Sequence, residues 1–77
     1  MPNKIKPLPP VAAEVRAEMA RQRLTQEQLS TRLGVHQTWV SKRVTGRVPF
    51  RVEEIERVAK ALDKPISQFV GVMEPVA

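Results

Sequence analysis

The sequence contains no cysteine and no tyrosine, and it has only three aromatic residues. Without cysteine the chain forms neither disulfides nor thiolate metal sites, a composition that suits a reducing cytoplasm. Because aromatic residues are so few, the core must be built mainly from aliphatic side chains. No apolar stretch approaches the roughly 20 residues that a membrane helix needs, and the N-terminus lacks the apolar block of a secretory signal.

Residues for catalysis or for a bound cofactor are also scarce. His36 is the only histidine, and no other ligand residue accompanies it, so we expect no metal site there. The sequence shows no nucleophile–base pair and no metal-ligand spacing. We therefore expect a protein that is not an enzyme and that uses no cofactor or small-molecule ligand.

Positive charge is concentrated in the middle of the chain. The 77 residues, enough for one domain with a small core, carry a net charge of +5. Residues 28–52 include five basic and no acidic residues, whereas residues 53–77 include five acidic and three basic ones. An asymmetric basic patch is typical of a surface that binds a phosphate backbone. From charge alone, a solvated basic face without a partner is the alternative.

Residues 24–46 show the pattern of two short helices joined at a glycine. Thr25 can cap the first helix, and Gly34 follows its last residue with the freedom to adopt a left-handed backbone. The second helix, at residues 37–45, has an inner face set by Val40 and Val44. Such a pair is typical of the helix-turn-helix, whose second helix enters the DNA major groove.

The rest of the chain predicts an all-α fold around this pair. Apolar spacing places helices at residues 11–23, 26–33, 37–45, 52–62 and 66–70. In the fourth helix the expected buried stripe comprises Val52, Ile55, Val58, Ala59 and Leu62.

Ser30, Gly34 and Val40 give the spacing of a small residue, a glycine four later and a branched apolar residue six after that. In this spacing the stretch resembles the lambda-repressor-like family, the Cro proteins and the DNA-binding domains of phage repressors. The resemblance covers residues 11–70 and implies a compact five-helix domain. It also implies a transcription regulator of Cro or immunity-repressor type that binds a double-stranded DNA operator, at the nucleoid of a prokaryotic or phage-infected cell.

Four side chains on the outer edge of residues 37–45 are candidates for base contacts in the major groove. An amide both donates and accepts hydrogen bonds, so Gln37 at the start of the helix suits adenine, whereas Lys42 suits guanine or a phosphate. The full set is Gln37, Thr38, Ser41 and Lys42.

Six further side chains are candidates for contacts with the DNA backbone. The resemblance implies that Gln26 binds a phosphate and braces the first glutamine of the recognition helix. Arg47 follows that helix in a loop, and Arg23 precedes the motif. The full set is Gln26, Trp39, Arg43, Thr45, Arg47 and Arg23.

Some of these positions depart from the family pattern. His36 takes the usual Ser or Thr cap position, where we expect it to cap less well, and Thr45 stands where Asn is common. Arg43 takes an apolar position, so its stem should cover the core edge while its guanidinium reaches solvent or phosphate. Trp39 has two interpretations, a partly exposed place near the DNA backbone or packing in the core.

Both ends of the chain leave alternatives open. Residues 1–10 hold four prolines and two lysines, which predicts a flexible arm that either follows the DNA backbone or has no role. The tail at residues 71–77 is either frayed or part of a contact between two copies on DNA. The competing function is an antitoxin-type regulator whose main partner is a protein, although only seven residues follow Val70. A membrane partner is not expected.

Overall fold

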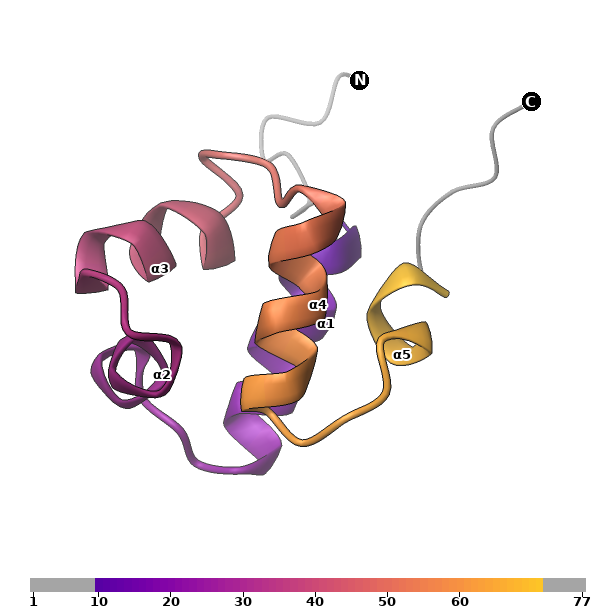
Figure 1. The fold of residues 1–77 in the computed structure, drawn as a ribbon, viewed down its shortest axis with the longest axis horizontal. Coiled ribbons are helices and arrows are strands. Elements are labelled where there is room, and N and C mark those ends of the chain that lie inside the picture. The colour runs from indigo at the N-terminus through magenta and orange to yellow at the C-terminus, as the bar shows by residue number, and fades with distance from the viewer. Residues whose placement is uncertain (1–9, 72–77) are drawn as a thin grey trace, which may run out of the picture.

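The computed structural model describes residues 10–71, and these residues form five helices (Figure 1). They are α1 (Pro10–Arg21), α2 (Gln26–Leu33), α3 (Gln37–Val44), α4 (Val52–Ala61) and α5 (Ser67–Val70). In Figure 1, α2 and α3 lie on one side of α4, and α5 lies on the other. The predicted all-α fold with five helices is confirmed for this part of the chain. The arm at residues 1–10 and the tail at residues 71–77 lie outside the described residues, except for Pro10 and Gly71.

Helix α2 begins and ends as its local sequence predicts. The Thr25 hydroxyl accepts a hydrogen bond from the Gln28 amide at 3.0 Å, and the Gln28 side chain accepts one from the Thr25 amide at 2.9 Å. These two bonds make a capping box, which pairs amides that the first turn leaves free. At the other end Gly34 has a φ of 70°. The predicted cap and the predicted left-handed exit are both confirmed.

Helix α1 ends two residues earlier than the sequence predicts. Arg23 adopts a φ of 53°, and the Leu24 amide donates to the Met19 carbonyl at 2.8 Å. A left-handed residue therefore closes this helix without glycine, and no local residue type marks the end.

Apolar side chains from all five helices form the core, and each stabilises the fold by about 1.5–3 kcal/mol on burial. One expected member is absent: Val52 is 57% exposed, so its place in the buried stripe of α4 was wrongly predicted. Helical side chains lean toward the N-terminus, so the first residue of α4 projects past the start of the helix. The largest fully buried side chains are Val15, Leu29, Val40, Val44, Ile55, Val58, Leu62 and Phe69.

A buried carboxylate, which the sequence analysis did not single out, ties α1 to α5. Glu18 is 3% exposed and accepts hydrogen bonds from the side-chain amides of Gln22 at 3.0 Å and Gln68 at 2.8 Å. Arg21 donates to the same carboxylate at 2.9 Å, and the Lys64 ammonium lies 3.9 Å away. The amides of Gln22 and Gln68 are the main reason that the pKa of Glu18 falls to about 2. We call Glu18 and these four partners the Glu18 cluster.

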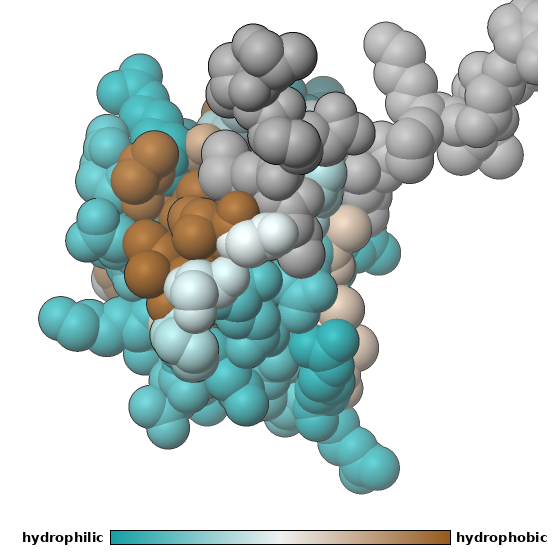
Figure 2. Space-filling view, turned by 90° about the vertical axis from the view of Figure 1, so that its right-hand side faces the viewer, coloured by the Kyte–Doolittle hydropathy of each residue, from teal (hydrophilic) through white to brown (hydrophobic). Residues whose placement is uncertain are grey.

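The side of the molecule that carries α5 exposes apolar surface (Figure 2). Ile66, which precedes α5, and Val70 within it pack on the core but are only partly buried. None of the helices within residues 10–71 has the length and apolar character needed to cross a membrane.

Candidate nucleic-acid interface

The turn between α2 and α3 is held by backbone hydrogen bonds as well as by packing. The Val35 amide donates to the Ser30 carbonyl at 3.1 Å, and the Gly34 amide donates to the Thr31 carbonyl at 3.2 Å. Ser30 is 6% exposed and donates its hydroxyl to the Glu27 carbonyl at 2.7 Å. Backbone hydrogen bonds thus tie the turn to α2, and the packing of α3 on α2 fixes the position of α3.

Helix α3 begins at Gln37 with a side-chain cap from His36. The Nδ1 atom of His36 accepts a hydrogen bond from the Thr38 amide at 3.1 Å. An imidazole nitrogen thus does what a Ser or Thr oxygen does in the family pattern. The start of α3 is therefore ordered, and its first side chains have a defined direction.

The four predicted base-reading side chains lie together on the outer edge of α3. Gln37, Thr38 and Lys42 are exposed, and Ser41 is partly exposed. None of their side chains forms a hydrogen bond with another residue of the described chain. Val40 and Val44, which face the core, are 1% and 2% exposed. We refer to the four outer side chains as the α3 edge; their donors and acceptors face solvent on a helix that is anchored from behind.

Exposed arginines lie in the segments that follow α3 and α1. Arg47 and Arg51, in the loop that follows α3, are exposed, as is Arg23 in the turn after α1. The Val48 amide donates to the Lys42 carbonyl at 3.0 Å, which folds this loop back on the end of α3. Arg47 is therefore held close to α3, and its contact with a phosphate stays a prediction.

Arg43 does not extend into solvent as expected. Its Nε donates to Glu54 Oε1 at 3.2 Å and its Nη2 to Glu54 Oε2 at 3.3 Å, and both side chains are 14% exposed. The guanidinium carbon lies 4.0 Å from the ring centre of Trp39, within the range of a cation–π contact. The Trp39 ring in turn meets Phe50 edge to face, with centroids 6.4 Å apart. Burial raises the pKa of Glu54, but hydrogen bonds from the Arg51 amide and Arg43 outweigh it and lower that pKa overall.

The other side chains predicted to contact the DNA backbone differ in their burial and in their hydrogen bonds. Trp39 is partly buried and packs against the core, and its contact with the DNA backbone stays a prediction. The Thr45 hydroxyl donates to the Ser41 carbonyl at 2.6 Å and thereby closes the end of α3. Gln26 is partly exposed at the start of α2, and no hydrogen bond joins it to Gln37 among the described residues. The brace that the resemblance implies is therefore not formed in this structure.

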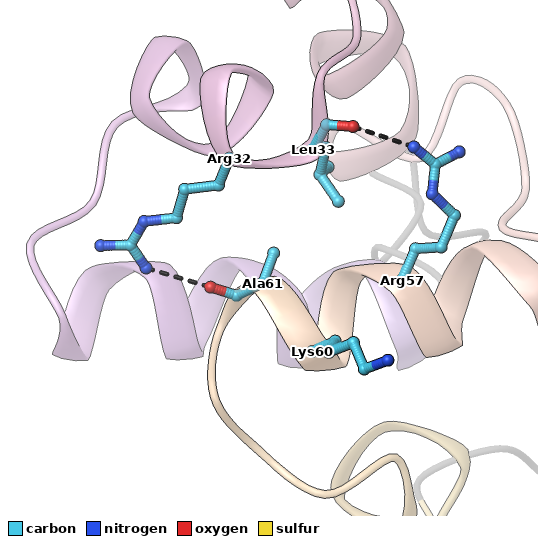
Figure 3. A pocket seen from close by; sticks show the side chains of 5 residues that line it. All are labelled: Arg32, Leu33, Arg57, Lys60 and Ala61. Atoms are coloured by element: carbon cyan, nitrogen blue, oxygen red, sulfur yellow. Dashed lines mark hydrogen bonds between the residues drawn. The ribbon is translucent and has the colours of Figure 1, made fainter.

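A second group of cations surrounds an open hollow between α2 and α4, shown in Figure 3. Arg32 of α2 donates to the Ala61 carbonyl at 3.0 Å, and Arg57 of α4 donates to the Leu33 carbonyl at 2.9 Å. Each arginine therefore caps the C-terminal end of the other helix, where the helix dipole favours a cation. Arg32, which the sequence analysis counted in the central basic stretch, is directed to the end of α4.

The described residues offer no site for a metal ion. No group of three or more His, Asp or Glu side chains comes together between residues 10 and 71. The chemistry available at the α3 edge is hydrogen bonding and charge, which suits recognition of a polar, anionic surface.

Comparison with known proteins agrees with this geometry. A family model described as a helix-turn-helix domain matches residues 10–66, so the chain belongs to the helix-turn-helix family. The lambda-repressor-like type fits both the match and the five-helix arrangement. The chain is therefore a DNA-binding protein of the helix-turn-helix class.

The chain is also similar to a solved structure, the hypothetical transcription factor NHTF from Neisseria. The TM-score is 0.74 at 25% sequence identity, over 97% of this chain and 88% of that one. A search of curated proteins found no match.

Proposed function

We propose that this chain is a sequence-specific transcription regulator that binds double-stranded DNA with α3 in the major groove. The observation that carries the proposal is the α3 edge, whose donors and acceptors face solvent without partners in the described chain. Buried polar groups in this molecule are paired with other groups: no side-chain nitrogen or oxygen buried within residues 10–71 lacks a hydrogen bond. The likeness to a hypothetical transcription factor supports the regulatory role.

Each residue of the edge has a role that its chemistry suits. Gln37 reads adenine through a pair of hydrogen bonds, and Lys42 reads guanine or holds a phosphate. Thr38 and Ser41 supply hydroxyls on the same exposed side of the helix. The backbone contacts in this proposal are Gln26, Trp39, Thr45, Arg47 and Arg23.

Within the helix-turn-helix class, we place the chain with regulators of Cro or phage-repressor type that act in the cytoplasm. Such a protein binds its operator as a homodimer whose two recognition helices lie about 34 Å apart, one turn of DNA. The apolar surface on the α5 side supplies a face on which two copies can meet (Figure 2). This arrangement requires a palindromic operator.

Selection from a random pool of duplex oligonucleotides tests the proposal directly. We expect enrichment of a common, palindromic site, and titration with that duplex should shift the backbone NMR signals of residues 37–45. A pool without an enriched site, with signals of α3 that stay unmoved, would refute the assignment. A stoichiometric protein partner in the same preparation would favour the antitoxin-type alternative.

A further inference from the structure

Helix α3 carries two cationic side chains, Lys42 and Arg43, and only that of Arg43 is enclosed by other side chains. The plane of the Trp39 ring covers it at 4.0 Å, and the Glu54 carboxylate binds it through two nitrogens. Its third nitrogen, Nη1, donates to the Trp39 carbonyl at 3.3 Å. Each of the three nitrogens thus donates a hydrogen bond within the protein, whereas Lys42 beside it is exposed.

Glu54 is itself fixed in place before it meets Arg43. Its Oε1 atom accepts a hydrogen bond from the Arg51 amide at 2.9 Å, so the carboxylate is tied to the first turn of α4. The positive end of the helix dipole favours a carboxylate in that position. Glu54 therefore offers a fixed point to which α3 can be attached.

The attachment matters because the backbones of α3 and α4 make few contacts. Helix α3 packs mainly on α2 and α1. Among the described residues the Arg43–Glu54 ion pair is the one that joins side chains of α3 and α4 by hydrogen bonds. Next to it, the Trp39 ring meets Phe50 edge to face. A bidentate arginine–carboxylate pair also restricts orientation, since two parallel hydrogen bonds fix the plane of the guanidinium.

We propose that Glu54 and Arg43 are positioning residues that hold α3 in the orientation needed to discriminate between DNA sequences, and that Arg43 does not bind a phosphate. The inference rests on the proposed function, and it assigns Arg43 a role different from the backbone contact expected from sequence. The pair carries no net charge, so it adds nothing to attraction for a phosphate backbone. Its contribution is to the geometry on which base contacts depend.

A charge-neutral double variant, Arg43→Gln with Glu54→Gln, separates positioning from phosphate binding. Binding is measured against salt on the selected duplex and on a scrambled duplex of equal length. We expect about a tenfold loss of affinity on the selected duplex, typical of a lost charge-assisted pair, and an unchanged scrambled-duplex affinity and salt slope. Equal losses on both duplexes, with a slope lowered by about one, would show that Arg43 binds a phosphate and overturn the proposal.

Arg47→Gln is the matched control, because it removes a cation from the exposed loop next to α3. It should lower the salt slope by about one and weaken binding to both duplexes alike. Glu54→Gln should have no further effect once Arg43 is Gln, because Glu54 acts through Arg43. Independent, additive losses would contradict that.

Measurements on the protein without DNA test the positioning role of Arg43 and Glu54 separately from the proposed function. Trp39 is the only tryptophan, so its fluorescence reports on the stacked guanidinium. In the double variant the emission should change, and amides of α3 should exchange faster while those of α1 do not. Unchanged emission and unchanged exchange would contradict the proposal that Arg43 and Glu54 position α3. A wild-type protein that binds no duplex would overturn the proposed function, and with it the role in DNA discrimination. Should the double variant fail to fold, Glu54→Gln alone is tested, because its side-chain oxygen can still accept the hydrogen bond from the Arg51 amide. It should show the same changes in affinity, emission and exchange with smaller magnitudes.

Discussion

The Glu18 cluster and the α3 edge are both groups of polar side chains on helices, and they differ in where their hydrogen bonds go. The carboxylate of Glu18 is buried and receives donors from three side chains. The side chains of the α3 edge are exposed or partly exposed and bond to no other described residue. The difference separates polar groups that hold the fold from polar groups that are available to a partner. Substitutions in one region, with stability and DNA affinity both measured, test whether the two regions are independent.

Replacing Glu18 should give the largest effect. Glu18→Gln removes the charge and leaves one amide donor of Gln22 or Gln68 facing another donor, so we expect a loss of about 2–3 kcal/mol in the free energy of unfolding. Urea denaturation measures this loss. Glu56→Gln, at an exposed position of α4, is the matched control and should stay within about 0.5 kcal/mol of the wild type. DNA affinity of the folded variant should not change; an affinity loss as large as the stability loss would mean that the two regions are coupled.

Acid should weaken the same cluster. The pKa of Glu18 is lowered from 4.5 to about 2, so its contribution to stability is complete above pH 4.5 and is lost as the pH falls toward 2. Denaturation at several pH values across this window should show a falling free energy of unfolding. Glu14 and Glu54 also have lowered pKa values, so part of the slope should persist in Glu18→Gln. An identical slope in that variant would show that Glu18 is not the main group.

At the α3 edge, Gln37→Ala should cost about 1–3 kcal/mol in binding to the selected duplex and should relax specificity at one base pair. The free energy of unfolding should hardly change, because Gln37 is exposed. Competition binding against duplexes with each base substitution provides the measurement. An equal loss on random DNA would assign Gln37 to the backbone rather than to a base.

Thr25→Ala should give the smallest effect and act on the element that supports the edge. Losing the cap of α2 should lower the free energy of unfolding by about 1 kcal/mol. Thr31→Ala is the matched control, because the Thr31 hydroxyl donates to the Glu27 carbonyl within the helix and caps nothing. Thermal unfolding compares the two, and equal shifts would argue against the capping box as the source of the loss.

Features set by neighbouring residues were predictable from the sequence. The Thr25 cap, the Gly34 exit and the inner valines of α3 depend on residues within one or two turns, and the structure has all of them. The exposure of Thr38 and Lys42 followed from the same periodicity, because neither lies three, four or seven residues from Val40 or Val44. Gln37 and Ser41 do lie at such spacings, so periodicity alone did not determine their exposure. Their proposed contacts with DNA stay predictions.

Features that join distant residues were not predictable. Glu18 is buried because Gln68 reaches it from 50 positions away, and nothing near Glu18 in the sequence indicates this. The guanidinium of Arg43 was expected to reach solvent or phosphate. Its actual partner, Glu54, belongs to the next helix, and local spacing does not reveal such a pair. Local periodicity also placed Val52 inside, although the end of a helix leaves its first side chain uncovered. A single sequence does not specify which long-range polar pairs form.

The handedness of the turn at Gly34 has a consequence for synthesis. A Cβ atom built on Gly34 would meet nothing within 4 Å, so the position selects against L-amino acids by backbone angle and not by size. A mirror-image residue favours the φ of 70° that Gly34 adopts. In a chemically made chain, D-alanine at position 34 would therefore fit the bend and reduce the freedom of the unfolded polymer, so the junction before α3 would become stiffer without a new contact.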